Sequence, residues 1–281
     1  LAVASESVAF TTLGFSLLGD VGPGEAVFVD AAGGLHRRRC GGAGRRFAPC
    51  VYEYVYMARP DSVLDGVSVY AARQALGRRL ARRVAAELGE EGLAALDCVV
   101  PVPETSRITA VAVAAALGLP YEEGLTKNRY IARTFLMPGQ ARREANVRKK
   151  LSPVRHVFAG RAVLLVDDSI VRGTTSRQIV RLARGAGARR VVFCSAAPPV
   201  RHPNVYGIGL ARREAMVAHG RDAAGVAAAI GADVVVYQEL GDLLGAVREL
   251  NPALEHFDAS VFDGVYVTRG GEAGGGGGGG G

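Results

Sequence analysis

The sequence predicts an α/β fold in which helices cover both faces of a mainly parallel sheet. From residue 67 onward, short runs that are apolar at nearly every position alternate with segments of helical periodicity. Strands that are apolar on both sides need cover on both sides, which is typical of parallel sheets with helical connections. With 281 residues the chain is long enough to bury such a core.

Helices and strands are expected in regular alternation. The first helix, residues 68–90, places Leu76, Leu80, Val84 and Leu88 on one face at helical spacing. In sheets of this kind, ligands bind at the carboxyl ends of the strands. Further helices are expected at residues 106–117, 176–186, 223–230 and 240–250, and strands at residues 98–102, 162–166, 190–195 and 233–237.

The pattern divides the chain into three parts. Residues 24–34 predict a β-hairpin, and residues 1–48 hold no complete core, so we expect them to be the β-rich end of a domain whose beginning is absent. Residues 49–268 carry the α/β pattern. Residues 269–281 are almost pure glycine, which cannot bury a core, and are expected to be a disordered tail.

The charge favours small anionic ligands over nucleic acid. The net charge is +7, but the basic residues do not form one basic helix with interleaved aromatic residues. The arginines of residues 78–83 are interpreted as a solvated helix face.

Neither a membrane span nor a secretory signal is indicated, because the sequence has no run of eighteen uncharged apolar residues and no basic leader. We therefore expect a cytoplasmic protein. The cysteines Cys40, Cys50, Cys98 and Cys194 lack paired spacing, which disfavours a disulfide framework or a zinc site.

The most informative segment is residues 163–176. A buried strand delivers Asp167 and Asp168 to its carboxyl end, and a loop containing Gly173 then opens a helix that begins with three hydroxyl residues. Backbone N–H groups at a helix start, together with hydroxyls, suit a phosphate monoester, and glycine allows its close approach. The carboxylates would repel that phosphate, so they are expected to face sugar hydroxyls or a divalent cation.

A purely structural interpretation is that the two acids end a strand and a hydroxyl residue caps the helix, which is common. The combination of paired acids, a small-residue loop and three successive hydroxyl residues is rarer. It favours a site for a sugar 5-phosphate with a free diol.

This segment resembles the diphosphoribosyl-binding signature of type I phosphoribosyltransferases. Further segments resemble blocks of the glutamine phosphoribosyldiphosphate amidotransferases, a family that catalyses the first committed step of purine synthesis, and they occur in that family's order. These segments are residues 50–62, 101–106, 127–135 and 204–208. The resemblance covers residues 1–268 and implies that residues 1–48 are the C-terminal remnant of an N-terminal nucleophile glutaminase domain.

The resemblance also implies roles for individual residues. Asp167 and Asp168 are expected to bind the ribose hydroxyls of phosphoribosyl diphosphate, with Mg²⁺ held by Thr105, Asp167 and Asp168. The expected catalytic residues are Asp167, Asp168, Lys127, Asn128, Tyr130 and Arg133. The expected substrate-binding residues are Tyr56, Ser169, Arg172, Gly173, Thr174, Thr175 and Ser176.

The implied partners are glutamine or ammonia as nitrogen donor and purine nucleotides as feedback inhibitors, in a homotetramer. Because the resemblance assigns no residue of this chain to the glutaminase nucleophile, we expect the chain to use ammonia but not glutamine.

Residues 124–150 are rich in Lys and Arg and lack apolar periodicity. An ordinary solvated basic loop is the simpler interpretation, but the block resembles the family's flexible catalytic loop. We expect a lid that closes over the diphosphate and excludes water.

Some relatives bind an iron–sulfur cluster through four cysteines. Cys50 stands at one ligand position, but Asn204 stands at the second and residues 258–261 replace a C-x-x-C pair. One thiolate cannot hold a cluster, so the chain is similar to the cluster-free branch.

Two other interpretations stay open. A phosphoribosyltransferase that salvages a free base shares the phosphate motif, but it does not need the segments 53–62 and 127–135. A non-catalytic nucleotide-sensing regulator needs an attached nucleic-acid-binding module, and no such pattern stands out.

Overall fold

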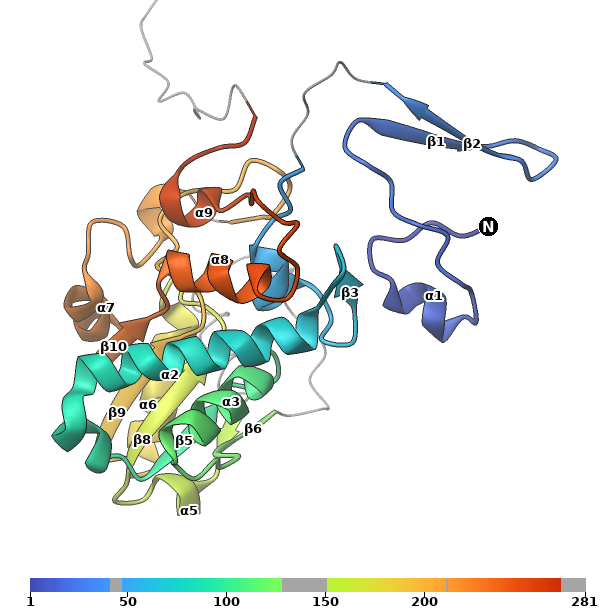
Figure 1. The fold of residues 1–281 in the computed structure, drawn as a ribbon. Coiled ribbons are helices and arrows are strands. Elements are labelled where there is room, and N and C mark those ends of the chain that lie inside the picture. Colours follow the sequence, from blue (N-terminus) through green and yellow to red (C-terminus); the bar gives the residue numbers. More distant parts are fainter. Residues whose placement is uncertain (41–46, 128–150, 211, 269–281) are drawn as a thin grey trace, which may run out of the picture.

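A computed structural model describes residues 1–40, 47–127, 151–210 and 212–268. At its centre is a four-stranded parallel sheet in the order β10, β9, β8, β5 (Figure 1). The predicted α/β fold is confirmed. The strands are β5 (Cys98–Pro101), β8 (Ala162–Asp167), β9 (Arg190–Ser195) and β10 (Val234–Tyr237).

Helices cover both faces of the sheet because successive residues of a strand point in opposite directions. Along β8, Val163 and Leu165 pack into one apolar cluster, and Leu164 and Val166 pack into another on the opposite face. Figure 1 shows the second face covered by the helices drawn in front of the sheet. The first cluster includes α6 (Thr174–Gly185) and α7 (Ala223–Ile230), and the second includes α2 (Val69–Ala94) and α3 (Arg107–Leu117).

The longest helix, α2, crosses the sheet in close contact with α3. A Cβ atom at Gly77 would lie 2.5 Å from the backbone oxygen of Thr109, so only glycine permits this approach. Leu76, Leu80 and Val84 are fully buried, as the helical spacing predicts.

The arginine face of α2 is only partly solvated, because α8 (Leu240–Arg248) lies beside it. Arg79 lies 3.1 Å from the carboxylates of both Asp242 and Glu249. The interpretation of residues 78–83 as a solvated face is therefore wrong for Arg79.

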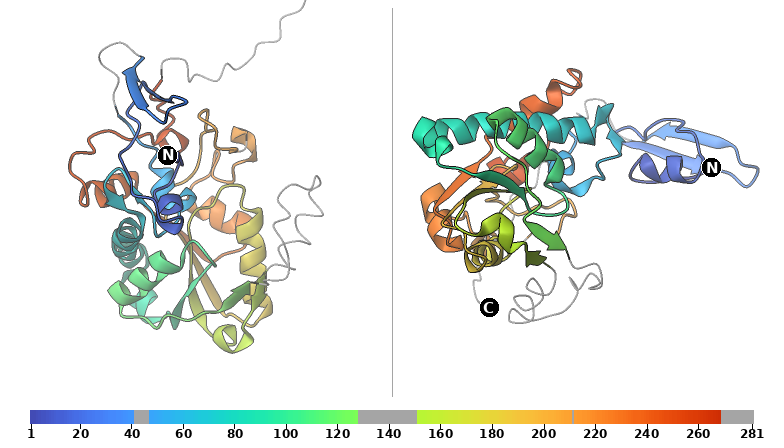
Figure 2. Two further views of the ribbon diagram at one scale, coloured as in Figure 1. Left: turned by 90° about the vertical axis from the view of Figure 1, so that its right-hand side faces the viewer. Right: turned by 90° about the horizontal axis from the view of Figure 1, so that it is seen from below.

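The N-terminal segment projects from the α/β body (Figures 1 and 2). It contains a short helix, α1 (Val8–Thr12), and the predicted hairpin, formed by β1 (Glu25–Val29) and β2 (Leu35–Arg39). Hydrogen bonds attach the segment to the body, where the Glu6 carboxylate accepts from the Ser62 hydroxyl at 2.7 Å.

Several short elements are not predicted by the sequence patterns. An antiparallel pair joins β6 (Leu125–Lys127) to β7 (Leu151–Pro153), so it brings the two borders of residues 128–150 together. Most of the predicted lid, residues 128–150, lies outside the described residues, as does the tail 269–281. The others are η1 (Glu53–Met57), β3 (Val63–Leu64), β4 (Val67–Ser68), α5 (Arg155–Phe158), η2 (Arg213–Ala215) and α9 (Ser260–Asp263).

Among the helices that the structure describes, none combines the length and apolar character needed to cross a membrane. Cys98 and Cys194 are buried in β5 and β9, as predicted, and all four cysteines are free thiols.

Candidate active site

The paired acids lie at the carboxyl edge of the sheet, as the sequence predicts. All residues of β8 are buried, and the strand ends at Asp167, whose side chain is 7% exposed. Asp168 follows immediately and is partly exposed. Neighbouring strands β5 and β9 end at the same edge, since all three run in parallel.

Hydroxyl groups hold the carboxylate of Asp168 on both oxygens. Thr105 donates to Oδ2, and Ser169 donates to Oδ1 over 3.0 Å. Asp167 instead accepts a backbone hydrogen bond, from the N–H of Asp168 at 2.9 Å. The two acids are therefore adjacent but have different surroundings.

Burial raises the pKa of both carboxyls, because a charged group loses its hydration there. The pKa of Asp167 is raised well above its ordinary value by burial and then by the adjacent Asp168 charge. For Asp168, the hydroxyls of Thr105 and Ser169 and the guanidinium of Arg73 oppose this rise of its pKa. Of the two, Asp168 is thus the acid whose negative charge is better stabilised.

The predicted phosphate loop connects β8 to α6. Gly173 precedes the first residue of α6 with a φ of 71°, a left-handed conformation that favours glycine. No side chain caps this helix start. The first N–H groups of a helix have no intrahelical acceptors, so an oxyanion at this position would receive them.

The three hydroxyl residues at the start of α6 differ in accessibility. Thr175 is exposed and Thr174 is partly exposed, whereas Ser176 is only 3% exposed. Arg172 of the preceding loop is exposed. Of these residues, Ser176 is the least accessible, so its hydroxyl would reach a ligand only after a local rearrangement.

The remaining predicted site residues lie on other segments. Tyr56 belongs to η1, where its ring centroid lies 6.1 Å from that of Tyr52. Lys127 is exposed at the end of β6. The predicted residues Asn128, Tyr130 and Arg133 lie outside the described part of the chain.

Two residues near the acids were not predicted individually. Tyr52 is 3% exposed, and its hydroxyl lies 2.8 Å from Ser169 Oγ. Arg73, on α2, is 1% exposed and donates to the backbone oxygens of Tyr54 and Ala58, at 3.1 and 2.8 Å. The signal for Arg73 was a basic residue on the apolar stripe of its helix, four residues after Val69 and three before Leu76.

Two of the positions that correspond to iron–sulfur ligands in some relatives, Cys50 and Asp258, are neighbours in the structure. Cys50 pairs with Asp258 in an isolated β-bridge, and burial raises the pKa of the Cys50 thiol to about 11. The side-chain oxygen of Asn204 instead accepts from the N–H groups of Tyr206 and Ile208.

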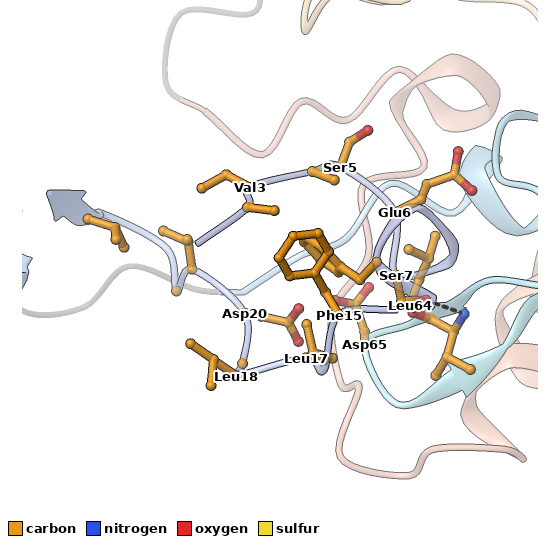
Figure 3. A pocket seen from close by; sticks show the side chains of 18 of the residues that line it. Val3, Ser5, Glu6, Ser7, Phe15, Leu17, Leu18, Asp20, Leu64 and Asp65 are labelled. Carbon is orange, nitrogen blue, oxygen red and sulfur yellow. Dashed lines mark hydrogen bonds between the residues drawn. The ribbon is translucent and has the colours of Figure 1, made fainter. Parts of the chain in front are cut away.

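A cavity of about 710 Å³ lies elsewhere, between the N-terminal segment and the body (Figure 3). Phe15, Leu17, Leu64 and Asp65 are among its lining residues. Neither acid of the pair lines it. We assign the site to the edge of the sheet because the paired acids and the open helix start converge there.

The parallel sheet with helices on both faces, the two acids at a strand end and the glycine loop at the next helix start match the type I phosphoribosyltransferase pattern that the sequence resembles. No protein-family model matches the chain. Curated proteins do match it over nearly its whole length, and they share one name.

The chain is 51% identical to the amidophosphoribosyltransferase of Pseudomonas aeruginosa, over 95% of the chain and 52% of that protein. It is 50% identical to that of Escherichia coli, with the same shares covered, and 45% identical to that of Schizosaccharomyces pombe, over 95% of the chain and 51% of that protein. The chain is thus homologous to amidophosphoribosyltransferases, and it spans about half the length of these relatives.

Comparison with solved structures supports the same relationship. The glutamine phosphoribosylpyrophosphate amidotransferase from B. subtilis, complexed with ADP and GMP, matches with a TM-score of 0.80 and 40% identity, over 93% of this chain and 56% of that one. A structure described as the allosteric regulatory enzyme of purine biosynthesis matches with a TM-score of 0.79 and 40% identity, over 93% of this chain and 54% of that one.

Proposed function

We propose that this chain carries the phosphoribosyl diphosphate site of an amidophosphoribosyltransferase. The reaction joins ammonia to the anomeric carbon of the ribose, releasing diphosphate and forming 5-phosphoribosylamine. The observation that carries the proposal is the position of Asp167 and Asp168 beside the uncapped start of α6. The naming of the relatives does not favour base salvage or a non-catalytic regulator.

The site separates the two halves of the substrate by charge. The 5-phosphate binds the loop and helix start at residues 169–176, where backbone N–H groups and exposed hydroxyls are donors. The ribose hydroxyls donate to the carboxylates of Asp167 and Asp168. As diphosphate leaves, the ribose ring becomes positively charged, and the carboxylates stabilise that charge.

The residues at this edge fit a magnesium ion. Mg²⁺ prefers oxygen ligands, and the candidates are the two carboxylates and the Thr105 hydroxyl. Burial raises the pKa of both carboxyls. A nearby cation would oppose this rise, because it favours the ionised form of a carboxyl group. Oxygen atoms of the substrate and of water would complete its coordination, since Mg²⁺ usually keeps several waters. When bound, the ion would neutralise charge on the departing diphosphate.

Residues 124–150 are proposed as the lid, with Lys127, Asn128, Tyr130 and Arg133 facing the substrate or the incoming ammonia. The pair formed by β6 and β7 supports this proposal, because it anchors both borders of the segment beside each other. Closure would exclude water from the reactive ribosyl centre.

The wider setting is also proposed from the relatives. Purine nucleotides are expected to inhibit, since a similar solved enzyme is complexed with ADP and GMP. A cytoplasmic homotetramer without an iron–sulfur cluster completes the proposal. The absence of a cluster rests on Cys50 being the sole cysteine at the four ligand positions, because one thiolate cannot hold a cluster.

Nitrogen-donor assays test the proposed function. The 281-residue chain is incubated with phosphoribosyl diphosphate and either ammonia or glutamine, with and without Mg²⁺, and released diphosphate is measured. We expect turnover with ammonia and Mg²⁺, rising with pH because the neutral amine is the nucleophile, and none with glutamine.

Binding of phosphoribosyl diphosphate is measured in parallel by calorimetry. A folded chain that does not bind this substrate in the presence of Mg²⁺ contradicts the site assignment. Glutamine-driven turnover with release of glutamate contradicts the expected restriction to ammonia.

A further inference from the structure

The hydroxyl of Tyr52 ends a chain of hydrogen bonds that reaches Asp168. Its oxygen lies 2.8 Å from Ser169 Oγ, and Ser169 Oγ donates to Asp168 Oδ1 over 3.0 Å. A serine hydroxyl has one proton, and that proton is given to Asp168. Tyr52 is therefore the donor to Ser169, and both hydrogen bonds point toward the negative charge.

The surroundings of Tyr52 fix the position of its hydroxyl. Its ring lies against Phe262 and Tyr56, with centroid distances of 5.9 and 6.1 Å. Arg73 holds the segment that follows, because its guanidinium donates to the backbone oxygens of Tyr54 and Ala58. A buried hydroxyl is costly unless it is hydrogen-bonded, so this geometry keeps Tyr52 bonded to Ser169.

We propose that Tyr52 is a positioning residue that orients the Asp168 carboxylate toward the ribose hydroxyls, acting through Ser169. Thr105 holds one carboxylate oxygen and Ser169 the other, so the carboxylate plane is fixed only while both donors are in place. The inference rests on the proposed function for its substrate. Its geometric part, the control of Asp168 by Tyr52, does not depend on the substrate.

The test is Tyr52→Phe, which keeps the ring and removes the hydroxyl. Tyr54→Phe is the matched control, because Tyr54 is buried on the same segment but its hydroxyl bonds to Asp65 at 2.9 Å, outside the chain of bonds to Asp168. We expect Tyr52→Phe to weaken binding of phosphoribosyl diphosphate about three- to tenfold, the value of one hydrogen bond in a network. Tyr54→Phe should leave this affinity unchanged.

A double-mutant cycle separates positioning from a merely structural role. Ser169→Ala removes the link between Tyr52 and Asp168. It should weaken binding of phosphoribosyl diphosphate to a similar extent, and combining it with Tyr52→Phe should add little, since both act through one chain of bonds. Fully additive losses of affinity would contradict the inference.

A measurement without substrate keeps the two proposals distinguishable. The NMR chemical shift of the side-chain carboxyl carbon of Asp168, which responds to the hydrogen bonds that its oxygens accept, is compared at one pH in the wild type and both tyrosine variants. A changed chemical shift in Tyr52→Phe but not in Tyr54→Phe supports the inference, even if the wild type does not bind phosphoribosyl diphosphate. Identical chemical shifts in wild type and Tyr52→Phe overturn it, whatever the binding result.

Discussion

Replacing Gly173 with alanine probes the phosphate loop directly. Gly173 has a φ of 71°, and an alanine in this left-handed conformation costs about 1–2 kcal/mol. Its Cβ would also lie 2.9 Å from Cγ2 and 3.1 Å from Cβ of Val217, and 3.3 Å from Cγ2 of Ile230. Overpacking of this kind adds about 1–3 kcal/mol, so the expected loss is about 2–5 kcal/mol of unfolding free energy.

The clash should also disturb the loop that is proposed to bind phosphate. The backbone N–H of Val217 donates to the backbone oxygen of Val171, in the loop, at 2.8 Å. A displacement of Val217 would therefore also displace the loop or break this hydrogen bond. Loss of one hydrogen bond to a charged phosphate weakens binding by roughly tenfold or more. Denaturant unfolding and calorimetric titration with phosphoribosyl diphosphate measure the two effects.

Gly118→Ala is the matched control. Gly118 ends α3 with a φ of 66°, but a Cβ there would meet nothing within 4 Å. This variant should lose only the conformational cost of about 1–2 kcal/mol and bind substrate normally. If Gly173→Ala is no less stable than Gly118→Ala and binds equally well, the assignment of the phosphate loop is wrong.

Two further substitutions test the acids and the buried arginine. Asp167→Asn should weaken binding of phosphoribosyl diphosphate by about ten- to a hundredfold, yet preserve the fold. Because burial raises the folded-state pKa of Asp167, the folded protein retains its proton longer than the unfolded chain, and wild-type stability should fall as pH rises above the ordinary value of 3.8. In thermal melts at increasing pH above that ordinary value, the variant should show a smaller decline of stability than the wild type. An unchanged decline would contradict the burial argument. Arg73→Met should lower the unfolding free energy by about 2–4 kcal/mol, because two buried backbone oxygens lose their donor. The exposed Arg78→Met, on the same helix, should change it by less than about 0.5 kcal/mol, and equal effects in denaturant titrations would refute the role of Arg73.

The sequence patterns predicted the sheet and its helices well, because apolar periodicity reports which sides of an element are covered. The strands β5, β8, β9 and β10 all lie where apolar runs were found. The short pairs β3–β4 and β6–β7 were missed, since two or three residues are too few for a period to be recognised.

The residues of the candidate site could be selected in part for a similar reason. Asp167, Asp168 and Gly173 occur within one short segment, so their chemistry could be recognised without knowledge of distant contacts. The lower accessibility of Ser176 could not be anticipated, because it depends on how α6 packs against the sheet.

The sequence by itself determined the α/β fold, the paired acids at a strand end and the glycine loop before an uncapped helix start, because these features depend on residues close together in the chain. Only the tertiary structure brought Tyr52 to Ser169 and Arg73 near Asp168. Tyr52 and Ser169 are 117 residues apart in sequence, and they meet because the residue that precedes η1 lies against the loop that follows β8. Packing between layers decides such contacts, and a local pattern does not encode which distant side chain will meet a strand end.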